Sequence, residues 1–152
     1  MTPRLDPKKV APGAYNAMLT LEKYVRECGI DPALADLLRM RASQINGCAY
    51  CLDMHSKDAR KEGVSEQKLY VLDGWRHSPA YSARERAALA WTEALTLIAE
   101  TGAPDDVYDE LRRHFSEAEI FNLSLLIVTI NAWNRLVVGS RIEHPVAQRA
   151  AA

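Results

Sequence analysis

The feature of this 152-residue chain that most constrains its fold is an apolar segment from about Glu117 to Val138. Ser116 and Glu119 fit a capping box at its start, and Gly139 follows it. Its apolar side chains fall nearly all round a helix: Ile120, Phe121, Leu123, Leu125, Leu126, Ile127, Val128, Ile130, Trp133, Leu136, Val137 and Val138. A helix of this kind is buried centrally or in an interface between subunits. We therefore expect the other elements to pack around a long helix that ends at Gly139.

Shorter segments with the same helical period precede this helix. Apolar residues recur at spacings of three and four, and cap residues or glycines separate the segments. Asp31-Pro32, for example, marks a helix start, with Asp as N-cap and Pro at the first helical position. The pattern predicts helices over 10–28, 32–45, 48–62, 66–72, 83–100, 104–115 and 117–138. No convincing strand is present, so we expect an all-α, single-domain bundle of about six or seven helices.

The two ends of the chain differ from this helical domain. Residues 1–9 contain Pro3 and Pro7, and we expect a flexible or loosely docked N-terminal arm. The helical domain is then expected over residues 10–140. The remaining residues, 141–152, are predicted to form a C-terminal tail whose Ala-rich end is mobile.

The composition argues against several classes of function. The net charge is −1 and there is no run of Lys or Arg, so nothing indicates binding to nucleic acid or to an acidic membrane. The longest apolar run, Leu123 to Ile130, is far too short to span a bilayer. The N-terminus lacks the apolar stretch of a signal peptide, and we expect a cytoplasmic protein.

Two cysteines and a histidine carry the chemistry that the sequence predicts. Asn46-Gly47 is a turn signal, and the residues after it have the pattern of a helix. Cys48 and Cys51 are therefore predicted in the first helical turn, on one face with His55. The positive end of the helix dipole favours a thiolate over a thiol, and a nearby His can accept the proton. A CxxC pair in a reducing compartment indicates redox or metal chemistry before a structural disulfide.

Residues 41–55, RASQINGCAYCLDMH, resemble the core motif of the AhpD-like alkylhydroperoxidases of the carboxymuconolactone decarboxylase family. That motif pairs a CxxC with a His four residues after the second Cys and a Glu twelve residues before the first. Asp36 occupies the Glu position here, and Tyr50 lies between the cysteines where some members carry His. The close resemblance covers roughly residues 33–65.

The resemblance implies an AhpD-like fold and a peroxidase of the peroxiredoxin type. Cys48 and Cys51 would cycle between dithiol and disulfide, with His55 and Asp36 as proton relay. The implied substrates are small organic hydroperoxides or hydrogen peroxide. The implied electron donor is a thiol or dithiol, such as a lipoyl- or thioredoxin-type protein, and no bound cofactor or metal is needed. Homo-oligomers, often trimers or hexamers with active sites near interfaces, are also implied.

Three assignments stay open on the residues alone. The spacing does not decide which cysteine attacks the peroxide. Asp36 is one methylene shorter than Glu, and is alternatively an ordinary first-turn acid favoured by the helix dipole. Glu85 resembles a functional acid of some members of the broader family, but it also fits a capping box with Ser82, which we prefer.

Other functions compete with the peroxidase hypothesis. A lactone decarboxylase of the same broad family would use a His-based acid/base site, and such members lack the redox pair. A non-enzymatic helical module could use the dithiol to sense redox state or could bind zinc. Zinc would need a distant fourth ligand beside Cys48, Cys51 and His55. The candidates for that ligand are His77, His114 and His144.

Overall fold

The computed structural model describes residues 2–146, which form helices and connecting loops without a strand. In chain order the elements are α1 (Pro7–Val10), α2 (Pro12–Glu27), α3 (Pro32–Ile45), α4 (Ala49–Lys61), α5 (Glu66–Tyr70), the 3-10 turn η1 (Trp75–His77), α6 (Ala83–Thr96), α7 (Ile98–Thr101), α8 (Asp105–Leu111) and α9 (Glu117–Ser140). The all-α prediction is confirmed. The described chain has more helices than the six or seven expected because α1 and α7 are separate short helices of four residues each.

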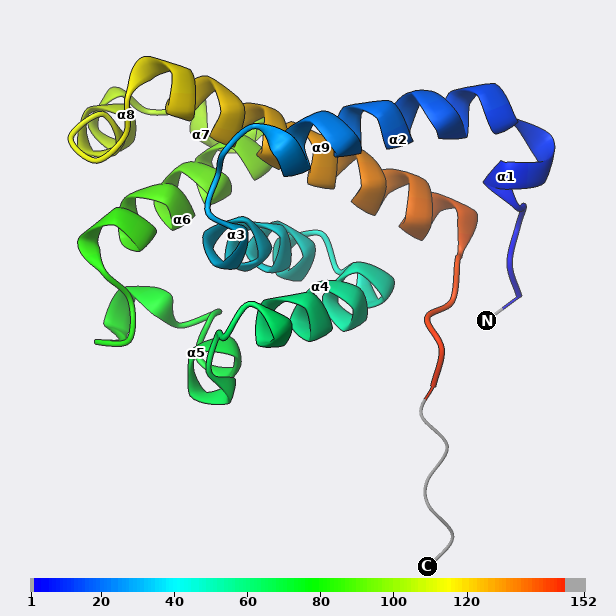
Figure 1. Ribbon diagram of the computed structural model, residues 1–152, viewed down its shortest axis with the longest axis horizontal. Helices are drawn as coiled ribbons and strands as arrows, with labels where there is room; N and C mark the ends of the chain where they lie inside the picture. Colours follow the sequence, from blue (N-terminus) through cyan, green and yellow to red (C-terminus); the bar gives the residue numbers. More distant parts are fainter. Residues whose placement is uncertain (1, 147–152) are drawn as a thin grey trace, which may run out of the picture.

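The long helix α9 packs against α2, α3 and α6, as Figure 1 shows. Leu123, Leu126 and Ile127 are buried in this contact. The opposite face of α9 is open, since Phe121 is 72% exposed and Val128 is 54% exposed. The prediction that this helix is buried centrally is therefore correct for only one face of α9. By length and composition α9 could cross a membrane, but a single such helix is weak evidence for a span, and half of its most apolar window is buried inside the described fold.

The predicted end of α9 is wrong by two residues, Val138 instead of Ser140. The helix continues through Gly139 to Ser140, and Arg141 adopts the left-handed cap conformation with φ of 57°. The N-terminal arm explains the extension. The backbone N–H of Arg4 donates to the Ser140 carbonyl at 3.0 Å, and its guanidinium donates to the Gly139 carbonyl at 3.1 Å. These bonds satisfy carbonyls of the last turn that would otherwise lack a partner.

Two other predicted helices are shorter than expected. The helix predicted over 83–100 is divided at Leu97, whose φ of −103° and ψ of 33° are not helical, into α6 and α7. The hydroxyl of Thr101 donates to the Ala94 carbonyl at 2.7 Å and so caps the interrupted turn. The helix predicted over 104–115 ends at Leu111, and Phe115 is reached through a tight turn that places its ring in the core.

The predicted arm contains α1, capped by Asp6, whose side chain accepts the backbone N–H of Lys8 at 3.0 Å. The arm lies against the end of α9, so the two ends of the described chain lie on the same side of the molecule (Figure 1). Its flexibility and the division into arm, domain and tail stay predictions. The Ala-rich end of the predicted tail, residues 147–152, lies outside the described residues.

The capping box of α9 makes a testable contribution to stability. The Glu119 carboxylate accepts a hydrogen bond from the Ser116 backbone N–H. This bond, together with hydrogen bonds from Arg84 and the Ser116 hydroxyl, lowers the pKa of Glu119 from 4.5 to about 2. Because the folded pKa is depressed, the stabilisation is present above pH 4.5 and is lost as the pH falls toward about 2. We expect Glu119→Gln to lower Tm at neutral pH. The Tm difference should shrink on acidification, and Glu117→Gln in the same turn is the control.

Candidate functional site

The site begins at the turn that joins α3 to α4. Asn46 is the C-cap of α3, and Gly47 has φ of 66°, the left-handed region that favours glycine. A Cβ on Gly47 would meet nothing within 4 Å, so the requirement for glycine here is conformational and not steric. The backbone N–H of Cys48 then donates to the Ser43 carbonyl at 3.0 Å. This bond fixes where the CxxC segment enters α4.

The two cysteines occupy different positions at the start of α4. Cys48 is the N-cap, one position before the predicted helical turn, whereas Cys51 is the third residue of the helix. Their Cα atoms are 5.4 Å apart and the sulfurs are bonded as a disulfide. Cys48 is completely buried, while Cys51 lines a pocket. Cys51 is also 2% exposed, so the pair borders the pocket through Cys51 without being open to bulk solvent.

His55 lies one helical turn after Cys51 and is buried. Its Nδ1 is 3.3 Å from Oδ1 of Asp36, a contact whose angles fall short of a hydrogen bond. Asp36 lies in the second turn of α3, so its alternative assignment as a first-turn acid is wrong. The shorter Asp side chain thus comes within 3.3 Å of the imidazole. The structure brings all four predicted site residues together at the α3–α4 contact.

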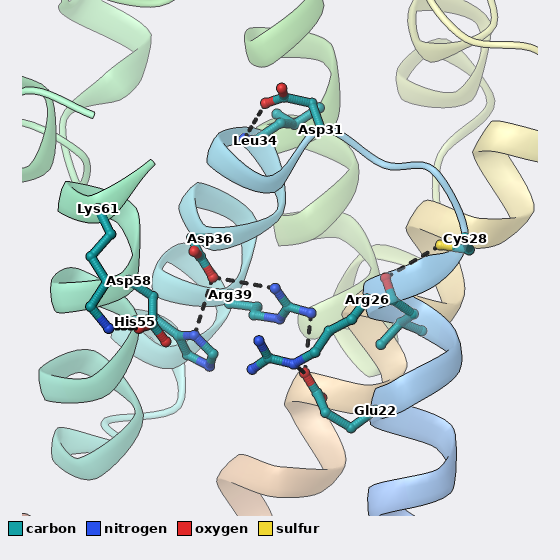
Figure 2. A network of polar contacts seen from close by, with 11 residues as sticks. Glu22, Arg26, Cys28, Asp31, Leu34, Asp36, Arg39, His55, Asp58 and Lys61 are labelled. Atoms are coloured by element: carbon teal, nitrogen blue, oxygen red, sulfur yellow. Dashed lines mark hydrogen bonds and ion pairs between the residues drawn. The ribbon is translucent and has the colours of Figure 1, made fainter. Parts of the chain in front are cut away.

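Figure 2 shows that Asp36 is also part of a chain of ion pairs that the sequence did not reveal. Arg39, one turn further along α3, donates to Asp36 and to Glu22 of α2, each at 3.2 Å. Glu22 in turn accepts a hydrogen bond from Arg26 at 2.9 Å. The chain runs from the partly exposed Arg26 to the buried His55.

A second carboxylate, Asp58, lies on the other side of this group, on α4 (Figure 2). Burial raises the pKa of Asp58, but the hydrogen bond and charge of Lys61 outweigh this effect. The charges of His55 and Arg26 act in the same direction, so the pKa lies below its ordinary value. Asp58 is therefore ionised at neutral pH and places a negative charge near His55.

A cavity of about 590 Å³ opens onto Cys51 and His55. Most of its wall is apolar or aromatic: Leu19, Met54, Ile130, Val137, Ile142, Tyr15, Tyr50 and Trp133. The rings of Tyr15 and Trp133 pack edge to face with centroids 5.7 Å apart. Glu22 and Arg26 also line the cavity, so the ion-pair chain reaches its wall. Residues of the N-terminal arm complete the cavity.

Buried amide side chains hold the CxxC turn against α9. The Asn46 amide donates to the side-chain oxygens of Asn131 and Asn134, both at 2.9 Å. Asn134 in turn donates to the Ser43 hydroxyl at 3.0 Å. Asn131 and Asn134 were missed from the sequence. Their amides inside a largely apolar helix were the signal that could have found them, because buried polar groups need partners.

The remaining candidates lie away from the pocket. Glu85 forms the capping box with Ser82, as preferred from the sequence, and pairs with Lys68. It lines a second cavity near Gly63. His114 contacts Glu110 at 3.2 Å on the surface. Among residues 2–146, no three His, Cys, Asp or Glu side chains are grouped in a way that could hold a metal ion.

The protein is a small helical fold that places a CxxC pair, a histidine and a carboxylate at a helix–helix contact. Comparison with known proteins identifies the family in which this arrangement occurs. Residues 12–94 match the sequence profile of the carboxymuconolactone decarboxylase family. The chain belongs to this family, which includes enzymes. The AhpD-like resemblance noted from the motif is thereby confirmed.

Three individual proteins illustrate the relationship. The uncharacterized protein YdfG of Bacillus subtilis (strain 168) is 40% identical over 138 residues, which is 91% of this chain and 94% of that protein. The crystal structure of ATU0492 from Agrobacterium tumefaciens, a protein of unknown function with a suggested role as the antioxidant defence protein AhpD, superposes with a TM-score of 0.94. Identity is 47%, over 96% of this chain and 100% of that one. The debrominase Bmp8 without ligand gives a TM-score of 0.75 at 25% identity, over 88% and 72% of the two chains.

Proposed function

We propose that this protein is a CxxC-dependent alkylhydroperoxidase that cycles Cys48 and Cys51 between dithiol and disulfide. One observation carries the proposal: Cys51 of a bonded CxxC pair and the buried His55, one helical turn apart on α4, both line the same largely apolar pocket. The suggested antioxidant role of the Agrobacterium protein, at 47% identity, supports the same reaction class.

In the proposed cycle Cys51 is the attacking residue, since it borders the pocket and Cys48 does not. His55 accepts the thiol proton. The Cys51 thiolate attacks the terminal oxygen of the hydroperoxide, the O–O bond breaks, and the alkoxide leaves as an alcohol after protonation. Cys51 is then a sulfenic acid. Cys48 displaces its hydroxyl group, and the products are the disulfide and water.

The disulfide must be reduced before the next cycle. A donor dithiol attacks one sulfur to form a mixed disulfide, and its second thiol then releases the reduced enzyme and oxidised donor. A thiol or dithiol donor, for example a lipoyl- or thioredoxin-type protein, fits this chemistry. A cytoplasmic location belongs to the same proposal, because reducing partners are found there.

The lining of the pocket supports organic hydroperoxides as preferred substrates over hydrogen peroxide. Tyr15, Trp133 and Met54 offer apolar surface to an alkyl or aryl group. Burial of such a group adds binding energy in proportion to its apolar area, about 25 cal/mol per Å². Hydrogen peroxide lacks this contribution.

We also propose that the protein is a homo-oligomer, and the open face of α9 gives a test. Phe121 and Val128 leave a stripe of apolar surface exposed on the described chain. We expect Phe121→Glu to lower the mass in sedimentation equilibrium. Tyr70→Glu, an aromatic that is 76% exposed on α5, is the matched control and should leave the mass unchanged. Equal masses for wild type and Phe121→Glu would argue against this face as the interface.

The experiment that tests the function is a thiol count on reduced, metal-free protein before and after one equivalent of cumene hydroperoxide. Peptide mapping by mass spectrometry then locates any new bond. The expected result is the loss of two thiols and a Cys48–Cys51 linkage, with Cys28 still free. Unchanged thiols would defeat the proposal and favour a lactone decarboxylase or a binding module. A disulfide that forms but never turns over with any reductant would indicate a redox sensor.

A further inference from the structure

Arg39 is a charged residue for which the proposed cycle has no role, although only 4% of its surface is exposed. Its guanidinium bridges Asp36 and Glu22, with both contacts at 3.2 Å. Asp36 is 6% exposed and lies 3.3 Å from His55. A buried guanidinium is costly to desolvate, and its two carboxylate partners offset that cost. Its contacts therefore place a positive charge directly behind the carboxylate that faces the imidazole.

We propose that Arg39 is a positioning residue, whose guanidinium holds the Asp36 carboxylate directed at His55 by dividing its hydrogen bonds between Asp36 and Glu22. The inference rests on the proposed function, because it assigns Arg39 to the proton relay of that cycle. Glu22 and Arg26 also line the pocket, so the same ion pairs connect the pocket wall to the relay (Figure 2).

The charges near His55 decide in which direction the ionisation of Cys51 and His55 moves when Arg39 is removed. In the reduced protein the Cys51 thiol and the His55 imidazole lie one helical turn apart on α4 and can be considered as one proton-exchanging pair. Loss of the first proton makes the pair one unit less positive, whichever of the two groups releases it. A nearby cation favours this loss, and unpaired carboxylates oppose it. Removal of Arg39 would leave the buried Asp36 without its cation and Glu22 paired with Arg26 alone, beside the pair of Cys51 and His55.

The other charges around His55 stay in place when Arg39 is changed. They are Arg26 on α2, the ion pair of Asp58 with Lys61 on α4, and Asp6, Lys8 and Glu143 in the pocket wall. The first ionisation of the pair, and with it the reactivity of Cys51, should therefore move to higher pH in Arg39→Met.

Helix α3 offers a matched control in Arg41. It is also largely buried and also bridges two carboxylates, Glu93 at 2.7 Å and Asp73. Neither partner lines the pocket or contacts His55. Arg41→Met thus removes a comparable buried arginine from the same helix without touching the relay. Thermal unfolding of both variants measures the structural cost separately.

The test is the pH dependence of iodoacetamide alkylation at Cys51 in reduced full-length protein, mapped by mass spectrometry. We expect Arg39→Met to raise the midpoint by about one pH unit or more. Arg39→Lys, which restores the charge, should recover most of the shift. Glu22→Gln, which removes one carboxylate and nearly preserves shape, should move the midpoint slightly to lower pH. Arg41→Met should match wild type.

Two results would overturn the inference: an Arg39→Met midpoint equal to that of wild type, or an equal shift in Arg41→Met. If Arg39→Met does not fold, Glu22→Gln provides the test, because its alkylation midpoint should move to lower pH. A Glu22→Gln midpoint that is unchanged or higher than that of wild type counts against the role of Arg39. The alkylation assay contains no peroxide. If the wild-type thiols do not react with cumene hydroperoxide, the proposed function is wrong. The alkylation midpoints test only the role of Arg39.

Discussion

Replacement of Cys51 by Ser should lower the rate of peroxide consumption by at least about 10³-fold, because a serine hydroxyl at neutral pH is a far weaker nucleophile than a thiolate. Cys48→Ser should behave differently. Its Cys51 can still react, so one equivalent of peroxide should be consumed and a sulfenic acid should remain without a resolving thiol. Stopped-flow peroxide consumption, combined with dimedone trapping of the sulfenic acid, measures both effects.

The third cysteine is the control for this pair. Cys28 ends α2, is partly buried, and its thiol donates to the Val25 carbonyl at 3.3 Å. Cys28→Ser preserves this donor and should keep wild-type turnover. Sustained turnover in either Cys48→Ser or Cys51→Ser would rule out the dithiol cycle. A dimedone adduct on Cys48 in Cys51→Ser would instead reverse the roles of the two cysteines.

Loss of His55 should have the second largest effect. A cysteine thiol without a neighbouring base ionises near its ordinary pKa of about 8.5, so little thiolate is present at neutral pH. We expect His55→Ala to slow the reaction with cumene hydroperoxide by roughly 10²–10³-fold near neutral pH. The deficit should narrow as the pH rises, because hydroxide then removes the proton without help. The measurement is the second-order rate constant as a function of pH.

Two further variants make the His55 result interpretable. His55 is 2% exposed, so truncation leaves a cavity. His55→Gln fills most of that space but cannot carry the proton, and it should show the same pH dependence. His77 is exposed on η1, and His77→Ala should match wild type. A rate deficit that stays constant across pH would mean that His55 does not act as the base.

Helix starts could be predicted because they depend on local chemistry. The side chains of Asp31, Ser65, Ser82 and Ser116 each cap a helix by accepting a backbone N–H from the third residue after the cap. The end of α9 could not be predicted in the same way. Arg4, 135 residues away, binds the carbonyl of Gly139, and this long-range contact overrides the usual preference of glycine for ending a helix.

The same distinction between local chemistry and long-range contacts applies to the candidate site. Cys48, Cys51 and His55 lie within two helical turns, so their spacing alone predicts that they meet. Arg39 and Glu22 are 17 residues apart, and Asn46 and Asn134 are 88 apart. Their contacts depend on how α2, α3 and α9 pack. The family motif included Asp36, but the cation behind it required the folded structure.

The pocket entrance has a consequence for how such a protein can diversify. Pro3, Leu5 and Lys8 of the N-terminal arm, together with Ile142 and Glu143 after α9, form part of the pocket wall. These residues lie outside the two buried hydrophobic clusters, apart from Ile142, which packs against the smaller one. Substitutions at Pro3, Leu5, Lys8 or Glu143 can therefore alter the shape and charge of the pocket while both clusters stay intact. The pocket wall and the hydrophobic core thus depend in part on different residues of this chain.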